Sequence, residues 1–297
     1  MLRGLTTTFC RVRVRAPLTR ASSSSCGAGI SLAGQGKVVV IETKDSRIRP
    51  KYDQIFTCQR PVLFKNYISH WPATSWLDDI PALQVRLQLT DENDTVVPVE
   101  LNGSYMSGDM QQAHVGLSSL LGTLDMEMKL DGEEKGLQWY VAQLELKDIS
   151  PMLVEEDTEV PEMCRTGKGD LYRTNIWLNG TSGSSSDCHQ DPFNNLLCQL
   201  HGTKTVTLYD PASAEALYPA INTAQKNTST IDFAHYERQG DEFAVDEQRY
   251  PLYHDPSKRT RYGPVTLEPG DALFIPHRYW HYVRAPNVSA SVNFWWL

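Results

Sequence analysis

The chain has 297 residues, of which 40% are hydrophobic and 22% are charged, and this is enough to bury one substantial core in one large domain. Its net charge of −8 argues against the general phosphate-binding surface of nucleic-acid proteins, so any acidic cosubstrate must meet a local basic group. No apolar run approaches the roughly 18 residues that a membrane span requires, and we expect neither nucleic acid nor a membrane as a partner.

The first 41 residues contain no Asp or Glu and carry arginines among serines and threonines. This composition is typical of a mitochondrial or chloroplast transit peptide. We therefore predict that residues 1–36 are a leader outside the fold, with a mitochondrial location, and that residues 37–297 form the folded domain. The alternative is a disordered basic tail without an address, which leaves the cytoplasm or the nucleus as the location.

Strand patterns begin the folded part of the chain. The run KVVVIET (37–43) predicts a first strand, and RPVLFKNYISHWPATSW (60–76) predicts a second strand followed by a turn. DTVVPVELNGSY (94–105) is also strand-like, with Pro98 marking an edge or a bulge. Between residues 106 and 130 apolar residues recur at mostly helical spacing, so this stretch is the best helix candidate.

The second half is crowded with strand patterns. Gly and Pro turns separate them, and such a succession of short strands predicts a sandwich or a barrel rather than alternating βαβ units. Residues 221–261 are polar and turn-rich, an insertion that either borders an active site or forms a mobile surface. The predicted strands cover residues 137–146, 171–180, 195–202, 204–210, 263–276, 281–285 and 289–297.

A histidine and an aspartate lie two positions apart in SSSDCHQDPFNNLLCQLHGTK (184–204). Residues i and i+2 of a strand face the same side, so His189 and Asp191 can point into one cavity. The pair is weak evidence by itself, because H-x-D also occurs by chance. A third ligand from a distant strand would complete a set of two imidazoles and one carboxylate, which suits non-haem Fe(II) and leaves coordination positions open.

The segment EPGDALFIPHRYWHYV (268–283) offers two histidines for the third position. His277 and His281 are four residues apart, so strand periodicity alone does not choose between them. His281 lies between Trp280 and Tyr282, whose rings can exclude water from a metal, whereas His277 adjoins an arginine and suggests a rim position. These neighbours favour His281.

Lys204 stands inside an apolar, strand-like run. A lysine in such a place is more often a solvated strand residue than a ligand. An iron with three protein ligands, however, can bind a 2-oxo acid through its oxo group and near carboxylate. The far carboxylate of 2-oxoglutarate then needs a fixed cation, and an ammonium on the strand after the H-x-D strand can supply it.

Five runs between residues 55 and 297 carry a family resemblance. They are RPVLFKNYISHWPATSW, VPVELNGSY, WYVAQ, HQDPFNNLLCQLHGTKTVTLYDP and FIPHRYWHYVRAPNVSASVNFWW. In this order they resemble the JmjC (cupin-like) 2-oxoglutarate oxygenases, most of all the branch of lysine-specific demethylase 8 and the JmjC protein arginine hydroxylases. The resemblance implies a mainly β fold, a double-stranded β-helix (jelly-roll) barrel with flanking helices, and makes residues 37–297 the catalytic domain.

The resemblance also implies roles for individual residues. Fe(II) would be held by His189, Asp191 and His281. The cosubstrate 2-oxoglutarate would contact Tyr140, Ser186, Asn195 and Lys204, with Asn293 as an amide that only some relatives place in the pocket. The cavity entrance would be lined by Asn175 and Trp177. Some of these residues have plainer interpretations when taken singly: Ser186 as part of a polar run, Trp177 as core, and Tyr140 as a buried strand tyrosine.

The implied activity is that of an Fe(II)- and 2-oxoglutarate-dependent dioxygenase, which consumes dioxygen, releases succinate and hydroxylates a side chain of a protein or peptide. We expect arginine as that side chain, because a guanidinium calls for a carboxylate and an aromatic plane, for which Glu100 and Trp177 are candidates. Glu100 can equally be an exposed strand residue. The alternatives are an N-methyl-lysine demethylase and a non-catalytic cupin-type binding protein. Because the chain stops directly after its last predicted strand, we expect a monomer.

Overall fold

The computed structural model describes residues 35–43, 51–90, 92–101, 111–129, 137–180, 182–221, 225–238 and 244–297. The expected leader lies outside this part of the chain except for its last two residues. Gln35 and Gly36 form β1, which pairs in parallel with β11 through Arg261 and Tyr262. The paired structure therefore begins two residues before the boundary that composition suggested.

Two β-sheets form the framework of the described chain, and this confirms the mainly β, jelly-roll fold. The five-stranded sheet contains, in spatial order, β1 (Gln35–Gly36), β11 (Arg261–Leu267), β10 (Lys204–Tyr209), β13 (Trp280–Ala285) and β8 (Ser184–Gln190). The nine-stranded sheet contains β2 (Val39–Glu42), β3 (Val62–Lys65), β12 (Ala272–Ile275), β9 (Asn194–His201), β14 (Ser289–Trp296), β7 (Leu171–Asn179), β6 (Trp139–Glu145), β4 (Val96–Leu101) and β5 (Gln111–Gly116).

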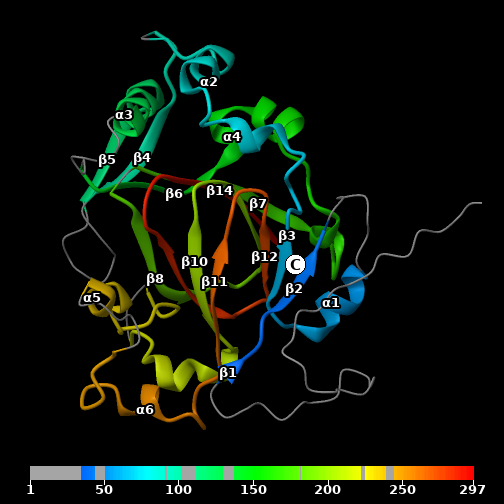
Figure 1. Ribbon diagram of the computed structural model, residues 1–297, viewed down its shortest axis with the longest axis vertical. Coiled ribbons are helices and arrows are strands. Elements are labelled where there is room, and N and C mark those ends of the chain that lie inside the picture. The colour runs from blue at the N-terminus through cyan, green and yellow to red at the C-terminus, as the bar shows by residue number, and fades with distance from the viewer. Residues whose placement is uncertain are drawn as a thin grey trace, which may run out of the picture.

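Short helices flank the sheets, as the resemblance implied. They are α1 (Tyr52–Cys58), α2 (Ile80–Arg86), α3 (Leu117–Lys129), α4 (Leu146–Ile149), α5 (Phe233–Arg238) and α6 (Pro251–His254), with the 3₁₀-helices η1 (Pro72–Ser75), η3 (Glu162–Arg165) and η4 (Pro211–Leu217) and the π-helix η2 (Leu153–Asp157). Figure 1 shows α2, α3 and α4 together at one end of the molecule and α5 and α6 at the other. None of the helices in the described ranges combines the length and the apolar character that crossing a bilayer requires.

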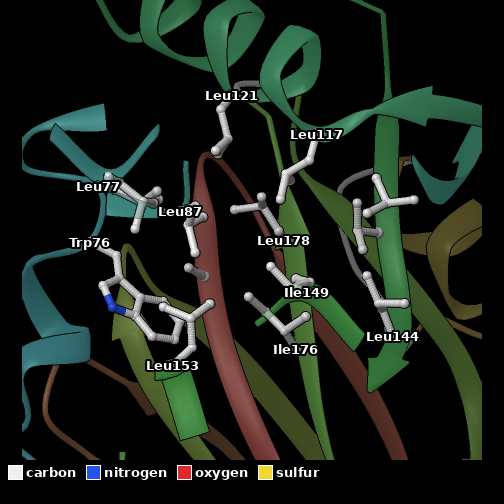
Figure 2. Close-up of a pocket in the computed structure, with 14 residues that line it drawn as sticks. Trp76, Leu77, Leu87, Leu117, Leu121, Leu144, Ile149, Leu153, Ile176 and Leu178 are labelled. Atoms are coloured by element: carbon white, nitrogen blue, oxygen red, sulfur yellow. The ribbon is translucent and has the colours of Figure 1, made fainter. Parts of the chain in front are cut away.

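The helix predicted between residues 106 and 130 is confirmed for Leu117–Lys129, which form α3 with buried leucines at a 3.6-residue period, whereas Gln111–Gly116 of the same stretch form the strand β5. These leucines pack, with residues of α2 and α4, over the outer face of the nine-stranded sheet and enclose a small, wholly apolar cavity. Figure 2 shows Ile176 and Leu178 of β7 on this side, facing Leu117 and Leu121 of α3. Because strand residues alternate between faces, Asn175 and Trp177 of the same strand face the space between the sheets.

That inner space is apolar at one end and polar at the other. Its apolar end is a cluster from both sheets that includes Leu197, Val206, Leu208, Leu273 and Ile275. Strand β14 shows how the sequence builds both faces at once. Its residues Val292 and Phe294 belong to the outer core, whereas the intervening Ser291 and Asn293 are polar, at most 1% exposed, and face inward.

The polar insertion of residues 221–261 borders the inner space at β8, the last strand of the five-stranded sheet. Thr228 forms a bridge with His189, the Gln190 amide donates to the Asn227 carbonyl at 2.9 Å, and the Ser229 amide donates to the Cys188 carbonyl at 2.7 Å. These contacts cover the free edge of β8 and place the insertion beside the candidate site. Pro98, predicted at an edge or bulge, lies in the part of β4 that pairs with β5 alone.

Candidate metal centre and cosubstrate cavity

Three predicted ligands meet at the polar end of the inner space. Strands β8 and β13 are antiparallel neighbours, and their register places His189 directly opposite His281, with ring centroids 4.3 Å apart. Asp191 follows the end of β8. Its Oδ1 lies 3.8 Å from Nε2 of His189, and its Oδ2 lies 3.7 Å from Nε2 of His281. All the candidate ligand atoms lie within 4.8 Å of one another, so a single metal ion can contact all three residues.

Backbone carbonyls orient both imidazoles. Nδ1 of His189 lies 2.7 Å from the carbonyl oxygen of Asp187, and Nδ1 of His281 lies 3.0 Å from that of Tyr279. A carbonyl accepts only, so each Nδ1 carries the proton and each Nε2 presents its lone pair to the metal position. Burial, followed by the neighbouring His189, lowers the pKa of His281 to about 4, which keeps this ring neutral and able to bind a metal at neutral pH. Two neutral imidazoles and one carboxylate fit Fe(II).

A β-bulge in β8 brings a fourth predicted residue to the same side. Along the pairing with β13, His281 is opposite His189 but Val283 is opposite Ser186, so β8 uses one more residue than its partner. Ser186 and His189 consequently both line the inner cavity, although strict alternation would put them on opposite faces. Cys188, the strand neighbour of His189, is fully buried and packs on the outer face.

Lys204 opens β10, and its side chain is fully enclosed, with 2% of the residue exposed. Its Nζ donates to Oγ of Ser291 at 2.7 Å and lies 5.7 Å and 5.8 Å from the ring centroids of Tyr140 and Trp177. Burial lowers the pKa of Lys204 to about 7, and within the described ranges no carboxylate forms an ion pair with it. An anionic ligand in the cavity would therefore stabilise the charged form of Lys204, and the enclosure of this side chain contradicts the plainer interpretation of a solvated strand residue.

An asparagine chain shapes the wall between the metal position and the entrance. Oδ1 of Asn293 accepts from Nε1 of Trp177 at 2.8 Å and from Nδ2 of Asn175 at 3.2 Å, while its Nδ2 donates to Oδ1 of Asn195 at 3.0 Å. Because Oδ1 of Asn195 accepts this hydrogen bond from Asn293, the amide hydrogens of Asn195 can point to a ligand in the cavity that Asn195 lines. Asn293 itself also lines the cavity.

One predicted entrance residue occupies a different place. Asn175 is fully buried and lies behind Asn293, its direct partner in the register of β7 and β14, rather than among the residues that line the cavity or its mouth. Its side chain is covered because Asn293 extends over it into the same inner space. Trp177, two residues further along β7, is half-buried and lines both the cavity and the mouth, as expected.

The mouth of the cavity is acidic and aromatic. Glu100 on β4 is the register neighbour of Tyr140 on β6, and the rings of Tyr140 and Trp177 lie 5.8 Å apart at 35°. Asp187 of β8 and Asn227 of the insertion complete the opposite rim. The structure therefore places Glu100 and Trp177 on one mouth, as the two candidates for one substrate pocket require.

The choice between the two late histidines is settled by position. His281 is 3% exposed and faces the other ligands, whereas His277 is exposed at the rim. The expectation that the rings of Trp280 and Tyr282 exclude water from the metal was wrong, however. Trp280 and Tyr282 do not flank the metal position; as strand neighbours of His281 they face the opposite side and pack in the cluster beneath the insertion.

Sequence reasoning also missed the residue that holds the amine of Lys204. Ser291 holds the Lys204 ammonium, and the only signal for it was its position two residues before Asn293 on the same face of the last strand. The carbonyl groups that orient the histidines gave no signal at all, because every residue has one.

A jelly-roll that carries an H-x-D pair, a distant histidine and a buried lysine in one cavity defines a class of metal-dependent oxygenases with a carboxylate cosubstrate. Residues 50–297 match the cupin-like domain family. The chain is 34% identical over 246 residues to Jumonji C domain-containing protein 5 of Drosophila melanogaster, covering 81% of this chain and 55% of the relative. It is 32% identical over 239 residues to lysine-specific demethylase JMJ30 of Arabidopsis thaliana, covering 80% and 49% respectively.

A third relative, lysine-specific demethylase 8 of Xenopus tropicalis, is 30% identical over 246 residues, which cover 82% of this chain and 49% of the relative. The chain therefore belongs to the cupin-like family, as a JmjC member. It spans about half the length of these curated relatives. Fe(II) and 2-oxoglutarate are the metal and cosubstrate of JmjC oxygenases, and the His189, Asp191 and His281 site fits that metal.

Proposed function

We propose that this chain is an Fe(II)- and 2-oxoglutarate-dependent oxygenase that hydroxylates arginine side chains of a protein or peptide. The observation that carries the oxygenase assignment is the pairing, in one cavity, of a three-residue metal site with a buried cation that has no protein anion in the described chain. A cosubstrate that combines a metal-chelating end with a second carboxylate satisfies both.

The residues of the cavity fall into two groups, those that would bind the metal and those that would bind the cosubstrate. His189, Asp191 and His281 would hold Fe(II), which when bound supplies the activation of dioxygen coupled to oxidative decarboxylation of 2-oxoglutarate to succinate. Lys204 neutralises the far carboxylate, and the hydroxyl groups of Tyr140 and Ser186 line the same cavity, where they would contact the cosubstrate. Asn195, fixed by Asn293, presents its amide hydrogens to the cosubstrate.

The mouth supports a cationic substrate side chain. Glu100 and Asp187 place two carboxylates on its rim, and the rings of Tyr140 and Trp177 offer flat apolar faces. A guanidinium pairs with a carboxylate through its planar fork and stacks on aromatic rings, so arginine uses both features at once. A protein already carrying a net charge of −8 also attracts a basic peptide.

Demethylation of N-methyl-lysine is the second candidate, because two of the relatives bear the name lysine-specific demethylase. The described mouth residues provide two aromatic rings, those of Tyr140 and Trp177, whereas recognition of a methylated ammonium relies on a cage of several rings. This difference favours arginine. A non-catalytic binding protein is disfavoured by the complete metal site and by the retention of the costly buried lysine.

The test is mass spectrometry of arginine-containing and N-methyl-lysine peptides after incubation with protein, Fe(II), 2-oxoglutarate and dioxygen. We expect one added oxygen on arginine. We expect Glu100→Gln to lose this product while 2-oxoglutarate consumption without peptide continues, because Glu100 lies at the mouth and not at the metal position. Glu215→Gln, a matched control at an exposed acid that pairs with Lys258, should behave as the wild type. Loss of methyl groups with release of formaldehyde, and no oxygen on any arginine, would overturn the arginine assignment.

A further inference from the structure

Three aromatic rings stack over the turn that carries the carboxylate ligand. Phe193, two residues after Asp191, lies between Tyr172 at the start of β7 and Trp295 near the end of β14. The rings of Tyr172 and Phe193 are 4.3 Å apart at 14°, and those of Phe193 and Trp295 are 5.6 Å apart at 21°. One turn residue is therefore held from both sides by two neighbouring strands of the other sheet.

This stack is separate from the cores that hold the fold together. Trp295 is 6% exposed but belongs to none of the three hydrophobic clusters, and Phe193 is half-buried. Tyr172 remains 55% exposed, with the Arg173 guanidinium 5.7 Å from its ring centroid. Because the stack lies outside the three clusters, we assign it the local effect of fixing the position of Phe193.

The Asp191 carboxylate has few other restraints. Within the described ranges its polar contacts are the two imidazoles, and no other side chain or amide donates to it. The turn itself is tied by the Arg278 amide, which donates to the Asp191 carbonyl at 3.0 Å, and by the His277 amide, which donates to Oδ1 of Asn194 at 3.2 Å. After Phe193 the chain enters β9, whose first residue Asn194 pairs with Trp296 of β14, so Phe193 is the residue between Asp191 and this pairing whose side chain is held by ring stacking.

We propose that Phe193 is a positioning residue that holds the Asp191 turn, and with it the carboxylate, in place for the metal before the metal binds. This inference rests on the proposed metal site. The two histidines sit on paired strands with fixed rings, whereas Asp191 lies beyond the end of β8. A ligand that must be ordered at the moment of binding lowers metal affinity by the entropy lost, and a preformed turn avoids that loss.

Two substitutions separate stacking from bulk. Phe193→Leu keeps an apolar side chain but removes both ring contacts, and Phe193→Tyr keeps the rings stacked. We expect Phe193→Leu to weaken Co(II) binding about tenfold, the lower end of the effect of losing support around a metal ligand, and Phe193→Tyr to bind as the wild type does. Phe64→Leu is the matched control, because it removes a ring pair with Tyr67 in the outer core, away from Asp191.

Two measurements provide the readout. Calorimetric titration with Co(II), at a temperature where all variants are folded by circular dichroism, gives the affinity. Hydrogen exchange of the metal-free protein gives the mobility of the turn, and we expect faster exchange in Phe193→Leu for the peptide containing the Arg278 amide, whose acceptor is the Asp191 carbonyl.

The outcomes distinguish the two proposals. Failure of the wild type to bind Co(II) or Fe(II) would overturn the metal site, whereas the exchange comparison in metal-free protein would still test the turn. If the wild type binds and Phe193→Leu binds equally tightly, or exchanges no faster at Arg278, the positioning role is wrong. Equal weakening in Phe64→Leu would also contradict it, because the effect would then be general destabilisation.

Discussion

Lys204 provides the sharpest test of the cosubstrate cavity, through the changes Lys204→Ala and Lys204→Met. Its ammonium is enclosed by Ser291 and by the rings of Tyr140 and Trp177. Removing the cation leaves the far carboxylate of 2-oxoglutarate buried and unpaired, at a cost of about 3–5 kcal/mol, which corresponds to about two to four decades in cosubstrate affinity. Metal binding should be unchanged, because Lys204 is not among the metal ligands.

The pH dependence of the free energy of unfolding provides a second, independent test of the burial of Lys204. Burial lowers the pKa of Lys204 from 10.5 to about 7, so between pH 7 and pH 10.5 the unfolded chain holds a proton that the folded chain has lost. Lys204 therefore makes the free energy of unfolding rise with pH across this window, by several kcal/mol at about 1.4 kcal/mol per pKa unit. Lys204→Met, which removes the buried charge at similar volume, should be the more stable protein at pH 7 without ligands and should lack this rise.

The assays are calorimetric titration of 2-oxoglutarate in the presence of Co(II), and urea unfolding of the ligand-free protein at several pH values. In the wild type, affinity should fall as pH rises above 7, since the cosubstrate binds the protonated amine. Two results would refute this reasoning and indicate that Lys204 is a solvent-exposed strand residue. One is an unchanged affinity of Lys204→Ala for 2-oxoglutarate, and the other is the same pH dependence of unfolding in the wild type and in Lys204→Met.

Two further predictions concern the metal and the leader. His189→Ala or Asp191→Ala should abolish metal binding and 2-oxoglutarate turnover, because the remaining side-chain donors are too few to hold the metal. His277→Ala, at the exposed rim, should keep both properties. Succinate production at the wild-type rate by either ligand variant would contradict the assignment of the iron site. We also propose that residues 1–40, fused to a fluorescent protein, direct it to the mitochondrion, since an arginine-rich segment without acids is attracted by an inside-negative membrane potential. Diffuse or nuclear fluorescence would show a tail without an address.

Much of the metal site followed from local rules. The two-residue period of a strand places His189 and Asp191 on one side, and the resemblance adds His281 and Lys204. The helix at Leu117–Lys129 followed from its leucine spacing. These features depend on residue type and near neighbours, which a sequence contains in full.

Other features depend on how strands far apart in the chain are paired, and here the tertiary structure decided. The bulge opposite His281 and Val283 turned Ser186 into the cavity against its expected alternation. The register of β7 with β14 put Asn175 behind Asn293. Strand pairing also turned Trp280 and Tyr282 away from the metal position.

The same reason explains the burial of Lys204 and the role proposed for Phe193. The sequence shows a lysine in an apolar run, but only the closure of two sheets over it, with Ser291, Tyr140 and Trp177 around Nζ, makes it a cation without a protein anion in the described chain. The stack on Phe193 likewise joins rings separated by 21 to 102 positions. Sequence determined which chemical groups are present and which way a regular strand turns them, and tertiary structure decided which groups meet, because registers, bulges and burial are set by contacts between distant segments.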